Sequence, residues 1–259
     1  MDPIKQFQEE VQANIAGLGR DHDLQALSRI WVREISPHKW AYNFAWMGRP
    51  AIQFPNDAWA MQEIIWEVRP DLIIETGIAH GGSLMFSASM LALLDMCDAI
   101  AEDQPMNPKV SKRKVLGVDI DIRAHNRQAI EAHPMASRVE MLQGSSIAAE
   151  TVEQVRKIAA GYSRVLVCLD SNHTHEHVLA ELQAYAPLVT PGSYCVVFDT
   201  IVEDMPAALF PDRPWGPGNN PKTAVHEYLR SQPQFEIDKA IDHKLQISVA
   251  PDGFLKRVA

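Results

Sequence analysis

Four apolar runs alternate with segments of helical length along this chain, and this alternation constrains the fold more than any other feature. The runs are DLIIET (71–76), VLGVDID (115–121), RVLVCLD (164–170) and YCVVFDT (194–200). Short apolar runs of this kind are typical of strands that are buried on both faces. Such strands form parallel sheets with helices on both sides, in which right-handed crossovers are nearly obligatory. The sequence therefore predicts a doubly wound, Rossmann-like α/β fold.

The two ends of the chain depart from this alternation. Residues 1–55 carry amphipathic stretches and the aromatic segment HKWAYNFAWMGRP, which has no strand-like alternation, so we expect an N-terminal helical cap or lid. Residues 56–259 are expected to form one Rossmann-like catalytic unit. Its last part contains the strand-like runs FEIDKAI, KLQISVA and GFLKRVA, which predict an antiparallel C-terminal hairpin. The sheet should then have about seven strands, mostly parallel.

Local signals refine this outline at three places. A helix is expected from Asp57, with Asp57 near its N-cap, and Ser83 is a plausible cap for the helix after the first core strand. Between Ile201 and Pro221 the chain is too rich in proline for a core element and longer than most connections, so we expect a lid.

Charge, apolar runs and cysteine content limit the partners and the compartment that we expect. The 24 Lys and Arg against 33 Asp and Glu give a net charge of −9, which argues against nucleic acid and anionic membranes as partners. No run approaches the roughly 18 to 20 continuous apolar residues of a membrane span, and the N-terminus lacks a signal-peptide core. Cys97, Cys168 and Cys195 form no CxxC pair, so they are interpreted as reduced packing residues. We expect a cytoplasmic protein.

Chemically suggestive residues gather where the first two core strands end. Parallel sheets bind ligands beyond the carboxyl ends of their strands, where helix N-termini point. The first strand ends in Glu75-Thr76-Gly77 and leads to Gly81-Gly82, and the second ends at Asp119. An acid about 40 residues after a glycine loop suits the ribose hydroxyls of an adenosine ligand. Two plainer readings remain: Asp119 and Asp121 could cap the next helix, and the glycines could form an ordinary tight turn.

The next two strands each end in an aspartate. Asp170 and Asp199 should lie on neighbouring strand ends, where two carboxylates suit a hard cation such as Mg²⁺. His173 follows Asp170 by three residues and is our candidate for a general base near neutral pH. Asp170 and His173 are therefore the predicted catalytic residues, while His175 and His177 are expected to start the next helix.

Two other functions compete with this interpretation. The cluster His173-Thr174-His175-Glu176-His177 is superficially similar to the metal-binding cluster of zinc hydrolases, although it is one residue short and that fold is rich in antiparallel sheet. A catalytically silent cofactor-binding protein is the second alternative.

Five segments together resemble the cephalosporin hydroxylase/rhamnosyl O-methyltransferase family, from about residue 40 to the end. They are IIETGIAHGGSLMF, VLGVDIDIRAHNR, VLVCLDSNHTHEHVLAEL, VTPGSYCVVFDTIVEDMP and RPWGPGNNPKTAVHEYL. The resemblance implies S-adenosylmethionine-dependent O-methyl transfer to a hydroxyl of a sugar, phenol or similar small molecule, with Mg²⁺ at Asp170 and Asp199 and often a homo-oligomer. The residues it implies at the cofactor are Glu75, Thr76, Gly77, Gly81, Gly82, Ser83, Asp119, Gly144 and Ser145.

One position departs from the family pattern. In metal-dependent relatives two adjacent metal-binding residues end the strand that here ends Phe198-Asp199. One ligand position is therefore apolar unless Thr200 serves, and Glu203 or Asp204 are candidates to compensate. The aromatic residues expected at an acceptor pocket are Trp40, Tyr42, Phe44, Trp46 and Trp215.

Overall fold

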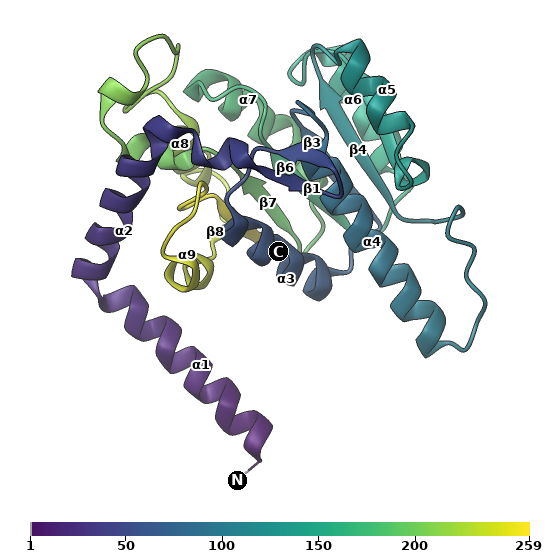
Figure 1. The fold of residues 1–259 in the computed structure, drawn as a ribbon, viewed down its shortest axis with the longest axis horizontal. Coiled ribbons are helices and arrows are strands. Elements are labelled where there is room, and N and C mark those ends of the chain that lie inside the picture. Colours follow the sequence, from purple (N-terminus) through teal and green to yellow (C-terminus); the bar gives the residue numbers. More distant parts are fainter. Residues whose placement is uncertain (1) are drawn as a thin grey trace.

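The computed structural model describes residues 2–259 and contains the predicted doubly wound sheet (Figure 1). Seven strands lie in the order β5-β4-β3-β6-β7-β9-β8, of which the first five are parallel and the last two antiparallel. The fold class predicted from the sequence is confirmed. The strands are β3 (Leu72–Thr76), β4 (Lys114–Asp119), β5 (Val139–Gln143), β6 (Val165–Leu169), β7 (Tyr194–Val197), β8 (Phe235–Ile237) and β9 (Phe254–Arg257).

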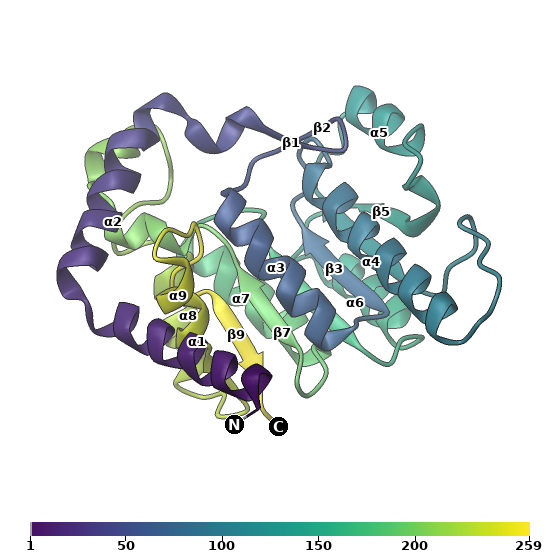
Figure 2. The same ribbon diagram turned by 60° about the horizontal axis from the view of Figure 1, so that its bottom comes forward.

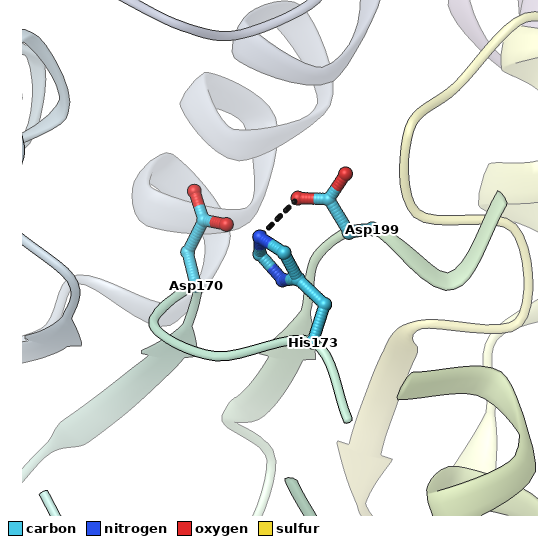
Figure 3. A group of neighbouring side chains, drawn as sticks. All are labelled: Asp170, His173 and Asp199. Carbon is cyan, nitrogen blue, oxygen red and sulfur yellow. Dashed lines mark ion pairs between the residues drawn. The ribbon is translucent and has the colours of Figure 1, made fainter. Parts of the chain in front are cut away.

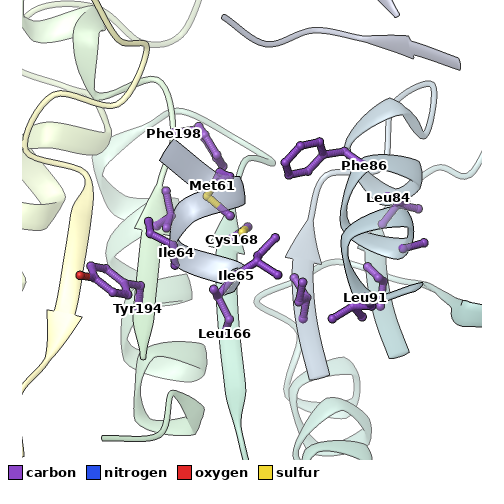
Figure 4. Close-up of a cluster of buried hydrophobic side chains, with 14 of the residues drawn as sticks. Met61, Ile64, Ile65, Leu84, Phe86, Leu91, Leu166, Cys168, Tyr194 and Phe198 are labelled. Carbon is purple, nitrogen blue, oxygen red and sulfur yellow. The ribbon is translucent and has the colours of Figure 1, made fainter. Parts of the chain in front are cut away.

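Helices cover both faces of this sheet (Figure 2). Because successive strand residues point to opposite faces, Ile73 of β3 faces one core, while Leu72 and Ile74 face the other. The first core includes Met61, Leu84 and other side chains drawn in Figure 4, and the second is closed by the helices that follow β5 and β6. The core helices are α3 (Pro55–Val68), α4 (Gly82–Ala101), α5 (Ala124–Glu131), α6 (Ala149–Ala159), α7 (His175–Tyr185), α8 (Pro221–Leu229) and α9 (Lys239–Leu245).

Strand register aligns the ends of the parallel strands. Thr76 on β3 pairs with Val118 on β4 and Leu169 on β6, and Leu169 pairs in turn with Val197 on β7. The residues that follow these four partners therefore leave the sheet along one edge. This register brings the predicted strand-end side chains together.

The N-terminal segment contains more than the predicted helical cap. Helices α1 (Pro3–Arg20) and α2 (His22–Ile35) are present, and α1 packs on α9 with no buried residue of its own. The expectation of no strand in the aromatic segment is wrong, because β1 (Phe44–Trp46) and β2 (Arg49–Ala51) form a short antiparallel hairpin. Met47 and Gly48 make its turn with positive φ angles of 48° and 83°.

The C-terminal hairpin is confirmed for two of the three predicted runs. Strands β8 and β9 pair antiparallel, but the middle run KLQISVA forms no strand, because its first residues end α9 and the rest is a loop. The antiparallel edge thus consists of one short pair beside β7.

Both predicted helix caps differ in the structure. Helix α3 begins at Pro55 with Phe54 as N-cap, so Asp57 lies inside the first turn and is fully buried. Helix α4 has Gly81 as its N-cap, and Ser83 makes no capping hydrogen bond. Proline at the first helical position needs no amide partner, which explains the earlier start of α3.

Helix α4 is also more apolar than the sequence analysis allowed. By length and composition alone it could cross a membrane, with a mean hydropathy of 1.6 over an 18-residue window. In the structure 44% of that window is buried, and the residues from Gly82 to Leu94 supply much of the first core. The helix therefore has the surroundings of a core helix.

Candidate active site

The glycine loop after β3 folds against the Asp119 carboxylate. Oδ2 of Asp119 accepts hydrogen bonds from the amides of Ile78 at 2.8 Å and Ala79 at 3.3 Å, and Oδ1 accepts one from Asp121 at 3.0 Å. Helix α5 has no side-chain cap, so the alternative that Asp119 or Asp121 caps it is wrong. Asp119 instead shapes the loop expected to hold the adenosine ligand.

The structure explains two of the glycines by close backbone approach. A Cβ atom at Gly77 would lie 2.0 Å from the Asp170 carbonyl oxygen, and φ at this position is +88°. A Cβ atom at Gly82 would lie 2.2 Å from the carbonyl oxygen of Pro50. These glycines therefore let β6 and the β1–β2 hairpin lie directly against the loop.

Gly81 and Gly82 begin α4, and the other predicted cofactor residues fall into two groups along the same edge of the sheet. Glu75, Thr76, Gly77 and Ser83 line a small cavity of about 60 Å³ that also touches Asp170. Burial raises the pKa of Glu75, whose carboxylate accepts a hydrogen bond from Ser87. The second group, Asp119, Gly144 and Ser145, follows β4 and β5, where the Gly144 amide donates to the Asp119 carbonyl at 2.8 Å.

The predicted metal residues converge with His173. Ligand atoms of Asp170, His173 and Asp199 all lie within 4.8 Å of one another, and His173 Nε2 is 3.6 Å from Asp199 Oδ2 (Figure 3). Burial, followed by the charge of Asp199, raises the pKa of Asp170 well above its usual range. Gln53 Nε2 donates to Asp170 Oδ2 at 3.2 Å. The groups that shift the pKa of Asp170 are acids, and two carboxylates in such surroundings suit a divalent cation.

The candidates for an additional ligand are occupied elsewhere. Thr200 donates its hydroxyl to the Pro251 carbonyl at 2.6 Å. Glu203 accepts from the Gly218 amide at 2.7 Å, and Asp204 pairs with Lys222. The hypothesis that Glu203 or Asp204 replaces the ligand lost at Phe198 is therefore not supported by their positions. These carboxylates anchor the proline-rich segment and the start of α8 instead.

The other two histidines of the cluster point to different partners. His175 contacts Thr223 through Nδ1 at 2.8 Å and Glu227 through Nε2 at 3.1 Å. His177 lies beside Ser146 and Ser171, with Nε2 at 3.1 and 3.2 Å from their hydroxyls. The histidines do not converge on one ion, so the zinc-hydrolase alternative lacks its site.

A large cavity of about 590 Å³ opens beside the Asp170–His173–Asp199 group. Its outer walls come from the C-terminal part of α2, the turn after it and the proline-rich segment. Trp215 stands edge-on to the His173 ring at 4.8 Å, and Arg213 lies 5.1 Å above the Trp215 ring. Apolar and aromatic lining residues include Val32, Trp40, Tyr42, Phe54, Met205, Leu209, Phe210 and Trp215.

The predicted acceptor-pocket aromatics divide between this cavity and other contacts. Trp40, Tyr42 and Trp215 line the cavity. Phe44 packs edge-on against Trp40 with ring centroids 4.9 Å apart, and Trp46 lines the small cavity and donates to Ser89 at 2.9 Å.

Two residues at the site were not predicted from the sequence. Gln53 reaches Asp170 from 117 positions away, and Arg49 reaches the glycine loop from the hairpin. Neither residue belongs to a recognisable motif. Their roles depend on how the N-terminal segment crosses the sheet edge.

The fold and this edge define the class of protein. A seven-stranded sheet with an antiparallel C-terminal pair, a glycine loop after its first parallel strand and an acid after the second is the fold of S-adenosylmethionine-dependent methyltransferases. The apo structure of CmcI shares it with a TM-score of 0.54 at 20% identity, covering 84% of this chain and 77% of that one. A second CmcI structure, described as Mg-SAM, gives the same score.

The chain belongs to the rhamnosyl O-methyltransferase/CmcI family, whose model matches residues 38–258. It is 33% identical over 230 residues to the rhamnosyl O-methyltransferase of Mycobacterium leprae, covering 85% of this chain and 88% of that protein. It is 32% identical over 231 residues to that of Mycobacterium tuberculosis (strain H37Rv), covering 85% and 83%. The family predicted from the five sequence segments is confirmed.

Proposed function

We propose that this protein transfers the methyl group of S-adenosylmethionine to a hydroxyl of a small acceptor, in the first instance a sugar. The observation that carries the proposal is the convergence of Asp170, His173 and Asp199 in the wall of the 590 Å³ cavity, which the glycine loop also lines. Curated relatives named rhamnosyl O-methyltransferases support a sugar hydroxyl. The aromatic walls also suit a phenolic or other natural-product-like acceptor.

The residues present fit a divalent cation such as Mg²⁺. Asp170 and Asp199 offer carboxylate oxygens, and a bound cation would lower the pKa of an acceptor hydroxyl. His173 also lines the large cavity, and we assign to its Nε2 the role of taking the hydroxyl proton. The acceptor oxygen then forms a bond to the sulfonium methyl as the carbon–sulfur bond breaks, leaving S-adenosylhomocysteine.

His173 can serve either as this base or as a third ligand, and one variant separates the two roles. We propose the base. His173→Ala should then lower kcat by about 10²-fold or more while leaving Mg²⁺ affinity close to that of the wild type. Loss of Mg²⁺ binding in this variant would instead make His173 a ligand.

The cofactor site is tested by calorimetric titration of S-adenosylhomocysteine with and without Mg²⁺. We expect micromolar binding that Asp119→Ala abolishes, since Asp119 ends the strand beside the glycine loop and holds the Ile78 amide of that loop. Asp121→Ala is the matched control, because Asp121 is exposed and its carboxylate pairs only weakly with Arg123, at 3.8 Å. No binding by the wild type under either condition would refute methyl transfer and favour a catalytically silent protein.

We further propose a cytoplasmic homo-oligomer that acts on a small molecule rather than on nucleic acid or a membrane. The net charge of −9 and the three free cysteines support this environment. Exposed apolar side chains at Ile4, Phe7, Trp59 and Trp66 support self-association. Light scattering after size-exclusion chromatography tests it, and a monomer at micromolar concentration would refute it.

A further inference from the structure

The β1–β2 hairpin is seated on the start of α4, directly beside the glycine loop. Pro50 lies so close to Gly82 that no side chain fits between them. Trp46 packs edge-on against Phe86 with ring centroids 4.8 Å apart, and its indole donates to Ser89 at 2.9 Å. The hairpin is therefore fixed to the helix whose N-terminus closes the loop.

Arg49 connects this hairpin to the loop itself. Its Nε and Nη2 donate to the His80 carbonyl at 2.9 and 2.7 Å, and Nη2 also donates to Asn126 Oδ1 at 3.0 Å. The buried Asn126 amide donates in turn to the Ala79 carbonyl at 2.9 Å. Two consecutive loop carbonyls are thus bound by side chains from two distant elements.

The loop has a physical need for such contacts. Ala79 has a φ of +45°, a left-handed conformation that is strained for a residue with a side chain. Asp119 holds the amide side of the loop, through Ile78 and Ala79. Arg49 and Asn126 hold its carbonyl side. A loop held from both sides is ordered before a ligand arrives, and the ordering entropy is then not lost on binding.

We propose that Arg49 is a positioning residue for the cofactor: through the His80 carbonyl and Asn126 it holds the glycine loop in its binding conformation. This inference rests on the proposed function, in that it places the cofactor at the loop. Arg49 acts through the loop backbone and makes no hydrogen bond to Asp170 or Asp199, although His80, whose carbonyl it binds, also lines the large cavity. The hairpin of residues 44–51 is accordingly a part of the cofactor site contributed by the N-terminal segment.

The test is the affinity for S-adenosylhomocysteine, measured by calorimetry on the full-length protein at a temperature where circular dichroism shows every variant folded. Arg49→Met keeps the aliphatic length but removes all donors, and should weaken binding about tenfold or more. Arg49→Lys retains a charged donor and should restore part of the loss. Arg33→Met is the matched control, because Arg33 lies on α2 and pairs only with its neighbour Glu34.

Steady-state kinetics separate positioning from general damage. Arg49→Met should raise KM for S-adenosylmethionine about tenfold and KM for the acceptor less, because the loop forms only one part of the wall of the large cavity. Asn126→Ala should have a similar effect, and the double variant should lose less than the product of the two single effects, because both residues hold one loop.

The outcomes are distinguishable. If the wild type binds S-adenosylhomocysteine and Arg49→Met binds it with equal affinity, this inference alone is overturned. No binding by the wild type overturns the proposed cofactor site and, with it, the inference. If Arg49→Met does not fold, Asn126→Ala decides, and unchanged affinity in that variant overturns the inference.

Discussion

The buried carboxyl of Asp57 predicts a stability that falls as pH rises from about 4 to about 7. Asp57 is fully buried in the first turn of α3, where it accepts hydrogen bonds from the Ser248 hydroxyl and from the Val249 amide at 2.9 Å. Burial is the main cause of the rise in its pKa from 3.8 to about 7, and the nearby charges of Asp199 and Asp242 make smaller contributions to that rise. The two hydrogen bonds oppose this rise only in part.

The sign and size of the effect follow from these values. Below pH 4 the carboxyl is protonated in both the folded and the unfolded chain, so it causes no pH dependence. Between pH 4 and 7 only the unfolded chain is ionised, and the free energy of unfolding falls by up to about 1.4 kcal/mol per pH unit. Above pH 7 the loss is complete. The rise in the pKa of Asp57 from 3.8 to about 7 corresponds to about 4 kcal/mol.

Asp57→Asn removes the ionisation and keeps the shape. Its amide oxygen can accept from the Val249 amide, and its nitrogen can donate to the Ser248 hydroxyl. We expect the variant to exceed the wild type in free energy of unfolding by up to about 4 kcal/mol at pH 8, and by only about 1 kcal/mol at pH 4.5. Urea unfolding followed by circular dichroism at both pH values, without added divalent cations, measures the difference.

A control and a refuting result complete this test. Asp23→Asn changes an exposed carboxylate in the first turn of α2 and should show no such difference between the two pH values. If Asp57→Asn changes stability equally at pH 4.5 and pH 8, the carboxyl of Asp57 does not titrate near neutrality, and the account of its burial is wrong.

Three further predictions concern the site. Gly77→Ala places a methyl group against the Asp170 carbonyl and should lower both S-adenosylhomocysteine affinity and Mg²⁺ affinity by about tenfold or more, measured by calorimetry. Asp199→Asn should remove most of the Mg²⁺ dependence of activity, lowering kcat about 10²-fold in a magnesium titration. Glu203→Gln weakens the anchor of the proline-rich segment at Gly218 and should raise KM for the acceptor without changing cofactor affinity.

The sheet was predictable because its signal is local and repeated. Each core strand is an apolar run bounded by polar residues, and register then follows from burial on both faces. The strand predicted for the run KLQISVA is wrong for the same reason: its alternation fits a strand, yet Lys244 and Leu245 end α9 and the rest of the run is a loop. A short apolar run does not distinguish a buried loop or helix end from a strand.

The N-terminal hairpin was not predictable from its own residues. Its strands have three residues each, and its pairing is supported by contacts with α4, such as Trp46 on Phe86. A two-stranded hairpin alone is marginally stable in water, so its stability comes from tertiary packing. The predicted cap at Asp57 was wrong for a similar reason. The buried Asp57 carboxyl accepts a hydrogen bond from the Val249 amide, about 190 residues away, and does not cap its own helix.

In the site, too, some residues could be predicted from local sequence patterns, and others depend on contacts between distant parts of the chain. The proximity of Asp170 and Asp199 was predictable because neighbouring parallel strands end at one edge of the sheet. The sequence predicted that Phe198 replaces a metal ligand. Its surroundings explain why the side chain is apolar, because it lines the small cavity with Trp46 and Phe86 and packs into the core formed with α3 and α4.

A carboxylate at this position would lie beside Asp170 and Glu75 in a largely apolar enclosure. Burial already raises the pKa of both acids, so a third charge there would be costly unless a cation offset it. With Phe198 in place, the groups that could bind a cation together with Asp170 are His173 and Asp199. All three residues line the large cavity, where the acceptor is expected. The apolar residue thus confines the charged chemistry to one side of the β6–β7 strand ends, between the glycine loop and the proline-rich segment.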